Sequence, residues 1–353
     1  MLRRWRCGLV GLDIGSSAVK AAELRRRGRK WSLAAFGVEP LPPGAVDAGV
    51  IADPDTVAAA VRRLLGRTAF RARSAAVALA GNTVMVRRIT LPAMSPEELD
   101  GSVYWEARQH IPFPAEDVAL DYQVLGTAAG EPDGATCEVL LVAARRDSVA
   151  TYVGVLEQAG VTVAVIDVGA FALRNAFALN YDIDPTAVAA LLDVGAAAVG
   201  LTVVAGGQPL CTRELPLGGR TYVEALGREL GLAEAAARQL LLGRRAAGRE
   251  PEEALPVVQS VNGSMVTEVA GALELFRAAM PPKGIGSLLL CGGASRIEGL
   301  AGALADGLGV GVTPLDPFRR LEPLAARSGR RSETDGSLAA VAVGLALRRA
   351  GDR

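Results

Sequence analysis

The sequence is poor in lysine, histidine and cysteine, and each shortage excludes a class of site. Lysine occurs only at Lys20, Lys30 and Lys283, so 35 of the 38 basic residues are arginines and one arginine is a weak signal. The four cysteines show no paired spacing typical of metal sites, and His110 is the only histidine. We therefore expect no metal centre built from these ligands. Unpaired cysteines also fit a reducing, cytosolic compartment.

The chain also lacks net charge and a long uninterrupted apolar segment. Its 38 acidic residues balance the basic ones, which argues against an electrostatically driven nucleic-acid binder. Residues 187–205 are apolar enough to suggest a membrane span, but Asp193 and several glycines interrupt them. The start of the chain mimics a signal peptide, but Asp13 ends its apolar run early. We expect a cytosolic protein of two or three domains with no transmembrane segment.

The first motif that carries chemistry is a strand that ends in an aspartate and a small-residue turn. The stretch LVGLDIGSSAVKAAEL has an apolar run up to Asp13 and a second β-rich run after the turn. A turn of Gly15, Ser16 and Ser17 directs backbone N–H groups and hydroxyls at one point, an arrangement that binds phosphate. Lys20 adds positive charge, and Asp13 could hold a phosphate-bound Mg²⁺ directly or through water. A tight hairpin with a solvated aspartate is the alternative, and this motif alone does not decide between them.

The motif recurs in the second half of the chain. The stretch AVAALLDVGAAAVGLTVV again has an apolar run, then Asp193, Gly195, small residues and a second β-rich run. A repeat of the Asp13 pattern at this distance suggests two similar domains, each presenting a phosphate hairpin to a shared cleft. A third stretch, SLLLCGG, is a buried strand that ends in Gly292 and Gly293, where a flat ligand can approach the backbone closely.

These three elements resemble the phosphate and adenosine loops of the actin/Hsp70/sugar-kinase ATPase superfamily. The resemblance implies an α/β, actin-like fold of two duplicated halves with ATP and Mg²⁺ held between them. The implied Mg²⁺ ligands are Asp13 and Asp193. The implied nucleotide-binding residues are Asp13, Gly15, Ser16, Ser17, Lys20, Asp193, Gly195, Gly219, Gly292, Gly293 and Ser295.

A stretch in the first half narrows the resemblance. WEARQHIPFPAEDVALDYQVL, residues 105–125, is similar to the signature of PilM, the actin-like family of type IV pilus assembly that is related to FtsA. Residues 168–180 and 338–348 are similar to that family's two connecting helices, so the match covers nearly the whole chain. The resemblance implies a cytoplasmic scaffold, peripheral to the inner membrane, that binds the N-terminal tail of the membrane protein PilN in a groove beside an inserted subdomain. Other pilus assembly proteins are further implied partners, and self-association is left open.

The element pattern and the resemblance together predict the domain organisation. Residues 1–80 form the first actin-like half, completed by 166–185 and 336–353; residues 81–165 form an inserted small α/β subdomain; and residues 186–335 form the second half, with a mostly helical subdomain at about 219–280. Within the insertion, Ser95-Pro96-Glu97-Glu98 predicts a helix start. Asp147 is expected to cap another helix, which ends near Gln158.

Four positions depart from the family pattern around the nucleotide. The family has threonine where this chain has Val199, an acidic residue at Gly169, and a glutamate and a lysine at Arg238 and Leu241. Each change removes a polar group, and hydrolysis needs a side chain that positions water. We therefore expect ATP–Mg²⁺ to act as a conformational ligand, with at most weak ATPase activity. Asp167 is a nearby carboxylate that serves either the site or a helix cap.

Two other functions share the predicted fold. A small-molecule kinase of the superfamily would need a catalytic base in its second-substrate cleft, and no convincing motif for one is found. An FtsA-like filament-forming protein would need a membrane-binding tail, which we do not expect here. The basic stretch RRRGRK, residues 25–30, is expected to be a solvated turn between strands, with contact to anionic lipid as the weaker alternative.

Overall fold

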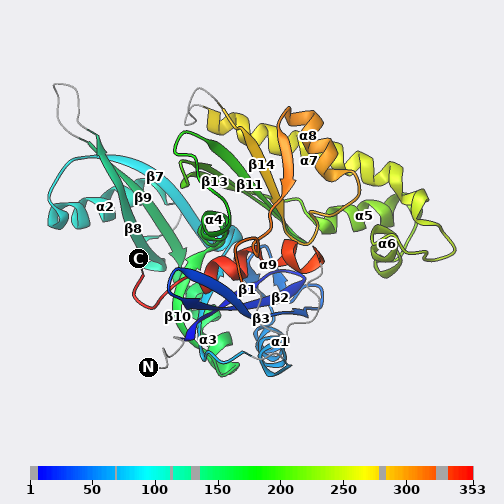
Figure 1. Cartoon of the computed structure of the whole chain (residues 1–353), viewed down its shortest axis with the longest axis horizontal. Helices are drawn as coiled ribbons and strands as arrows, with labels where there is room; N and C mark the ends of the chain where they lie inside the picture. Colours follow the sequence, from blue (N-terminus) through cyan, green and yellow to red (C-terminus); the bar gives the residue numbers. More distant parts are fainter. Residues whose placement is uncertain are drawn as a thin grey trace.

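The computed structural model describes residues 7–67, 70–111, 114–128, 136–277, 284–322 and 333–352. The chain builds two five-stranded sheets, a three-stranded sheet and a two-stranded ribbon. One five-stranded sheet lies above the other in Figure 1, and the three-stranded sheet projects at the upper left.

The first half is organised around a mixed sheet with the strand order β10-β6-β1-β2-β3. Its strands are β1 (Cys7–Ile14), β2 (Ala18–Arg27), β3 (Lys30–Pro40), β6 (Ser74–Leu79) and β10 (Thr162–Val168). The first three are antiparallel neighbours, while β6 runs parallel to both β1 and β10. Helix α1 (Pro54–Arg67) packs into the core of this half, and Asp53 caps it by accepting a hydrogen bond from the Thr56 N–H at 3.0 Å.

The second half repeats this topology with the strand order β13-β12-β11-β14-β15. Its strands are β11 (Val188–Val194), β12 (Val199–Ala205), β13 (Gln208–Leu215), β14 (Ser287–Cys291) and β15 (Gly311–Pro314). Again the first three are antiparallel neighbours, and β14 runs parallel to β11 and β15. The same order and directions in both sheets confirm the predicted duplicated, actin-like α/β fold.

Helices cover the outer face of the second sheet and fill the space between the two sheets. The covering helices are α5 (Gly219–Leu230), α6 (Glu234–Leu241), α7 (Leu255–Phe276) and α8 (Leu300–Leu308), which lie at the right and top of Figure 1. The helices between the sheets are α4 (Gly169–Asn180) and α9 (Glu333–Ala346). One apolar cluster joins residues of both sheets, such as Leu9 and Leu191, to Ala172 of α4 and Val341 of α9. The two halves therefore share a core through the connecting helices.

The insertion has its own sheet and its own small core. Its elements are β7 (Val84–Pro92), α2 (Pro96–His110), β8 (Val118–Ala128) and β9 (Thr136–Arg145). The predicted helix start is confirmed as a capping box, in which the Glu98 N–H donates to Ser95 Oγ and the Ser95 N–H donates to the Glu98 carboxylate. The short ribbon of β4 (Val46–Asp47) and β5 (Val50–Ile51) lies in the first half.

Residues 146–165, predicted to belong to the insertion, pack with the first half instead. Tyr152 and Leu156 of α3 (Arg146–Gln158) belong to the same apolar cluster as Val61 of α1, and β10 pairs with β6. The last insertion strand ends at Arg145, so this boundary was placed too late. Helical periodicity shows that a helix has an apolar face but not which sheet that face covers.

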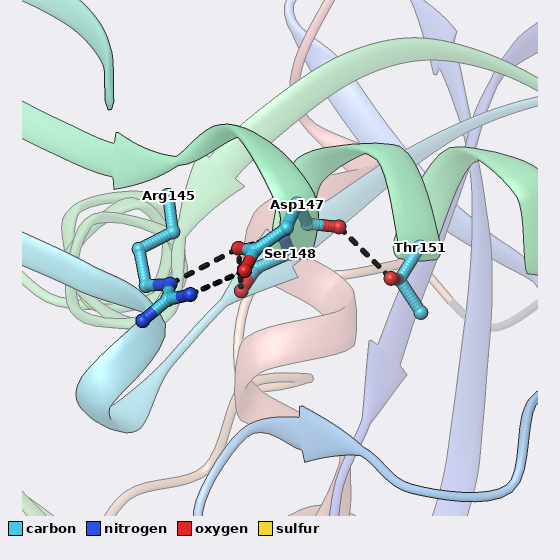
Figure 2. A network of polar contacts seen from close by, with 4 residues as sticks. All are labelled: Arg145, Asp147, Ser148 and Thr151. Carbon is cyan, nitrogen blue, oxygen red and sulfur yellow. Dashed lines mark hydrogen bonds and ion pairs between the residues drawn. The ribbon is translucent and has the colours of Figure 1, made fainter. Parts of the chain in front are cut away.

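The start of α3 also differs from the prediction. Arg145 occupies the N-cap position, and Asp147 lies in the first turn, where its carboxylate pairs with the Arg145 guanidinium (Figure 2). Asp147 also accepts a hydrogen bond from the Ser148 N–H at 2.6 Å, and its carbonyl accepts one from Thr151 Oγ1 at 2.8 Å. The contact with Arg145 and the Ser148 N–H lower the pKa of Asp147 to about 2. This network fixes the point where the chain leaves the insertion.

No helix within the described ranges combines the length and the apolarity needed to cross a bilayer.

Candidate functional site: the interdomain cleft

The two aspartate hairpins face a common cleft between the halves, as predicted. The cleft has a volume of about 1700 Å³, above the usual range for ligand pockets. Of the predicted nucleotide-binding residues, those that line it are Asp13, Gly15, Ser16, Ser17, Lys20, Asp193, Gly195, Gly219, Gly292 and Gly293.

The two hairpins close in the same way. The Gly15 N–H donates to the Ala18 carbonyl at 3.1 Å, and the Gly195 N–H donates to the Ala198 carbonyl at 2.9 Å. Each aspartate precedes its glycine by two residues at the end of a buried strand. The hairpins differ in charge, because Asp13 pairs across the strands with Lys20 whereas Asp193 pairs with Gly200. Only the first hairpin therefore carries its own cation.

Backbone donors at both hairpin tips are available for an anion. Within the described part of the chain, the N–H groups of Ser16, Ser17, Ala196 and Ala197 donate no hydrogen bond. These residues line the cleft together with Lys20. Unpaired N–H groups at a turn beside a cation are the arrangement that binds phosphate oxygens. The tips thus fit the phosphates of a nucleotide.

The charges at the base of the cleft are strongly coupled. Lys20 Nζ lies 2.9 Å from Asp13 Oδ2. Burial and the neighbouring charge of Asp13 raise the pKa of Asp193 to about 6, although Lys20 opposes this shift. Burial alone would lower the pKa of Lys20, but the charges of Asp13 and Asp193 outweigh it and raise that pKa. Lys20 therefore stays protonated at neutral pH and holds two carboxylates that would otherwise repel each other.

The loop after β14 brings backbone against the second hairpin. Gly292 has φ of +92°, and a Cβ there would lie 2.4 Å from Asp193 Oδ1, so only glycine fits. The Gly219 N–H donates to the Gly195 carbonyl at 3.0 Å, which ties the start of α5 to the same hairpin. Ser295 is buried behind the loop and donates to the Gly292 carbonyl at 2.7 Å. Ser295 is absent from the cleft lining, so it positions the loop.

The positions that depart from the family pattern lie in different environments. Gly169, Arg238 and Leu241 line the cleft, and Arg238 pairs with Glu234 at 2.7 Å. Val199 does not line it: its side chain is fully buried in the core of the second half. Its lack of a hydroxyl therefore removes no group from the cleft surface.

Asp167 does not serve the cleft. It is buried, accepts a hydrogen bond from the Val168 N–H at 2.8 Å, and lies 3.3 Å from Arg348 Nε. Burial raises the pKa of Asp167, against the opposing charge of Arg348. The pair anchors the end of α9 to β10.

Sequence reasoning missed one carboxylate of the cleft. Glu214 on β13 lines it and accepts a hydrogen bond from the Gly81 N–H, which lies at the root of the insertion. Glu214 is exposed overall, but partial loss of water around its carboxylate raises its pKa, against the opposing effect of the Gly81 N–H. No turn, repeat or spacing marks this residue in the sequence, and only the packing of the halves brings it to Gly81.

The cleft fits Mg²⁺ only together with phosphate. Within the described residues, no group of three or more His, Cys, Asp or Glu side chains is placed to hold a metal ion. Mg²⁺ is commonly held by one or two carboxylates, water and substrate phosphates. Asp13 and Asp193 beside the two hairpin tips match this requirement.

A second cavity, of about 420 Å³, lies on the insertion. Its lining combines apolar side chains with two arginines: Tyr104, Ala107, Arg108, Ile111, Pro114, Glu116, Val118, Leu120 and Arg146. Arg146 Nε donates to the Glu116 carbonyl at 3.1 Å. Much of this lining falls in residues 105–125, the stretch with the family signature.

The duplicated sheets and paired hairpins define an actin-like protein, and known structures agree. Ethanolamine utilization protein EutJ from Carboxydothermus hydrogenoformans is 14% identical, with a TM-score of 0.57 over 98% of this chain and 90% of that one. MreB 5 of Spiroplasma citri bound to AMPPNP is also 14% identical, with a TM-score of 0.52 over 95% and 94% of the two chains. At this identity the likeness shows the fold alone.

The family follows from two stronger matches. The family model described as type IV pilus assembly protein PilM matches residues 11–350. A structure described as the PilM-PilN type IV pilus biogenesis complex is 32% identical, with a TM-score of 0.85 over 96% of this chain and 98% of that one. The chain belongs to the PilM family of type IV pilus assembly proteins.

Proposed function

We propose that this chain is a cytoplasmic scaffold of type IV pilus assembly that binds the N-terminal tail of a PilN-like membrane protein. The observation that carries this proposal is the likeness to the PilM-PilN complex over nearly the whole chain. Binding to such a tail would hold the protein at the inner membrane through its partner.

The insertion cavity is the proposed docking site for the tail. Its lining combines the apolar side chains of Ala107, Ile111 and Leu120 with the guanidinium groups of Arg108 and Arg146. Extended peptides commonly bind by placing apolar anchors into such grooves. The network of Figure 2 supports the site, because it fixes the start of α3, from which Arg146 reaches the cavity.

ATP with Mg²⁺ is the proposed ligand of the interdomain cleft. The hairpin tips and Lys20 would hold the phosphates, and Asp13 and Asp193 would hold the metal directly or through water. Bound between the halves, the nucleotide would favour their closed arrangement. Its role here is conformational, since the cleft offers no side chain at Gly169 to position water.

Tyr104 and Trp105 allow a matched test of the docking site. Both are exposed aromatic residues of α2, but only Tyr104 lines the cavity. We expect Tyr104→Glu to weaken binding of a synthetic PilN tail from the same organism by about tenfold or more, because it places a charge at an apolar contact. Trp105→Glu should bind like the parent protein. Calorimetric titration, with and without ATP–Mg²⁺, gives both affinities.

Two results would contradict the proposal. Absence of detectable binding by the folded parent protein, with and without ATP–Mg²⁺, would remove the scaffold assignment. An equal loss of affinity in both variants would show that the tail does not bind at the cavity. Circular dichroism melts of both variants check that the protein stays folded.

A further inference from the structure

The first-half sheet gathers basic residues at the end opposite the cleft. Asp13 lies at the cleft end of β1, and the other end of β1 begins at Cys7, which pairs with Arg25 of β2. The β2–β3 hairpin turns beyond this point, at Gly28. Residues 26–30 of the turn are all exposed. The stretch expected to be a solvated turn is therefore an exposed basic tip at the sheet end.

Two other segments bring arginines to the same end. The Arg71 N–H donates to the carboxylate of Glu23 on β2 at 2.6 Å, and Ala75 of β6 pairs with Val10 of β1. These contacts place Arg71 next to β2, whereas Arg73 lies at the same end of the sheet on the β10 side, where its carbonyl accepts a hydrogen bond from the Thr162 N–H. The C-terminal end of α9 also reaches this region, since a Cβ on Gly8 would lie 3.8 Å from the Ala346 carbonyl oxygen. Arg349 follows directly.

We name this surface the basic face and define it by six exposed arginines. They are Arg26, Arg27, Arg29, Arg71, Arg73 and Arg349. They come from three segments that are far apart in the sequence and lie at the same end of the sheet in the folded protein.

Among the residues that the structure describes, few acidic groups neutralise the basic face. Glu322 pairs with Lys30 at 2.5 Å, Asp352 accepts a hydrogen bond from the Arg349 N–H at 2.8 Å, and Glu23 is fully buried. Within the described residues, the side chains of Arg27 and Arg29 make no hydrogen bond or ion pair. Because the whole chain has no net charge, this is a local concentration of positive charge.

We propose that the basic face binds the surface of a bilayer that contains anionic lipid. Neither the interdomain cleft nor the insertion cavity includes any of its arginines, so the face suits an extended surface better than a ligand of those cavities. Guanidinium groups match phosphate oxygens in pairs, and clustered basic residues are attracted to anionic headgroups.

In the described β2–β3 hairpin, the environment of the tryptophan next to the basic tip favours a membrane over single-stranded nucleic acid. Trp31 is half-buried against an apolar cluster and has the Arg26 guanidinium over its ring at 5.5 Å. It is therefore not free to stack on bases, as proteins that bind single strands require. The inference goes beyond the proposed tail binding, and it is tested without any tail peptide, so each can fail alone.

The test is cosedimentation of the full chain with vesicles. Vesicles of phosphatidylcholine alone are compared with vesicles that also contain phosphatidylglycerol, at about 0.05 M and about 0.5 M NaCl. We expect binding only to the anionic vesicles, and loss of binding at high salt. Arg27→Glu combined with Arg29→Glu should lower the partition coefficient by at least about tenfold.

A charge-matched double variant is the control. Arg245→Glu with Arg277→Glu makes the same change in net charge on exposed residues of the second half, outside the cleft. It should bind anionic vesicles within about threefold of the parent protein, as remote surface charges are screened. No binding by the parent protein, or equal loss in both variants, overturns the proposal. Displacement from vesicles by duplex DNA at equal phosphate concentration also overturns it, because the face would then prefer nucleic acid.

Discussion

At the scale of single residues, the cleft concentrates charge in a way that costs stability. Asp193 is half-buried in the cleft beside Asp13, with Lys20 as the nearby cation. A carboxylate whose pKa is raised is less stable in its charged form than it is in water. Such a cost is expected where a buried acid serves a ligand rather than the fold.

The first prediction concerns the pH dependence of this cost. The pKa of Asp193 is about 6 in the folded protein, against about 3.9 for an unfolded aspartate. The cost is therefore fully present above about pH 6 and is lost as the pH falls toward about 4. Asp193→Asn should raise the free energy of unfolding by about 1–3 kcal/mol at pH 8, and the gain should shrink at pH 4.5. Urea unfolding at both pH values measures it.

The same variant separates stability from ligand binding. Because the amide that replaces the carboxylate would supply no charge to a metal, stabilisation by ATP–Mg²⁺ should disappear in Asp193→Asn. A variant that is less stable than the parent protein at pH 8, or that keeps the full effect of ATP–Mg²⁺, would contradict the role assigned to Asp193.

The second prediction concerns turnover. Gly169 offers no side chain to the cleft, Asp167 points into the protein interior, and Glu214 is bonded to Gly81. Steady-state phosphate release should therefore lie far below the ~10 s⁻¹ typical of enzymes. A Cβ on Gly169 would meet the Leu79 carbonyl oxygen at an ordinary 3.7 Å, so Gly169→Glu is sterically accessible.

Gly169→Glu should raise phosphate release at least about tenfold by adding a group that orients water. Asp13→Ala is the control for contaminating activity. Parent turnover near ~10 s⁻¹ that disappears in Asp13→Ala would show that Gly169 is no impediment.

The sequence could not predict which side chains of the site point into the cleft. Spacing located the two hairpins and the Gly292–Gly293 turn, because backbone conformation there depends on local residues. It could not show that Val199 and Ser295 face away from the cleft, since that depends on the register of β12 and on the path of the loop after β14. Glu214 of β13 was missed because only tertiary packing brings it to the cleft and to Gly81.

At the scale of elements, the crossing of α4 and α9 joins the two halves. A Cβ on Gly344 of α9 would lie 1.7 Å from the Ala172 carbonyl oxygen of α4, so the helices approach backbone to backbone. Both helices also touch the cleft: α4 begins at Gly169, and the Gly292 N–H donates to the Ser337 carbonyl of α9 at 2.8 Å. The loops that line the cleft are thus in direct contact with the connecting helices.

The third prediction tests this crossing. Gly344→Ala should lower the free energy of unfolding by about 1–3 kcal/mol, because the added methyl forces the helices apart. Gly263→Ala on α7 is the matched control, since no atom lies within 4 Å of its added Cβ. It should raise stability by roughly 0.5–1 kcal/mol, as alanine favours helix over glycine. Urea unfolding measures the free energy of unfolding of both variants. Equal changes in this free energy would contradict the close crossing of the two helices.

Whether a segment forms a helix or a strand was easier to predict than which domain that helix or strand packs with. The helix start at Ser95 and the repeated hairpins follow from local chemistry and were identified correctly. The assignment of α3 and β10 failed, because the partner of an apolar face is chosen by tertiary packing. The end of the insertion gives no signal in the sequence, because the chain returns to the first-half sheet through a helix of ordinary composition.

At the scale of the whole molecule, polar contacts join separate parts of the chain beside the cleft. Glu214 of the second half accepts a hydrogen bond from the Gly81 N–H, which lies where the insertion begins. Arg220 at the start of α5 pairs with Asp47 of β4 at 2.9 Å, and both side chains are largely exposed. Gly81 is packed against the Ala48 carbonyl, where its Cβ would lie at 2.0 Å. Because Gly81 precedes the first strand of the insertion, its hydrogen bond with Glu214 joins the second half to the start of the insertion.

The last prediction compares these two contacts by hydrogen exchange. Glu214→Ala leaves the Gly81 N–H without an acceptor, so exchange in peptides that cover residues 80–84 should speed up by roughly tenfold, the effect of losing about 1–1.5 kcal/mol. Glu214→Gln keeps an oxygen acceptor and should exchange like the parent protein. Arg220→Ala removes only an exposed ion pair, worth less than about 1 kcal/mol, and should change exchange at residues 46–50 by at most a few fold.

If Glu214→Ala and Arg220→Ala gave the same small effect, Glu214 would be no more than a cleft-lining carboxylate. If Glu214→Gln exchanged as fast as Glu214→Ala, the charge of Glu214 rather than its hydrogen bond would hold the halves together.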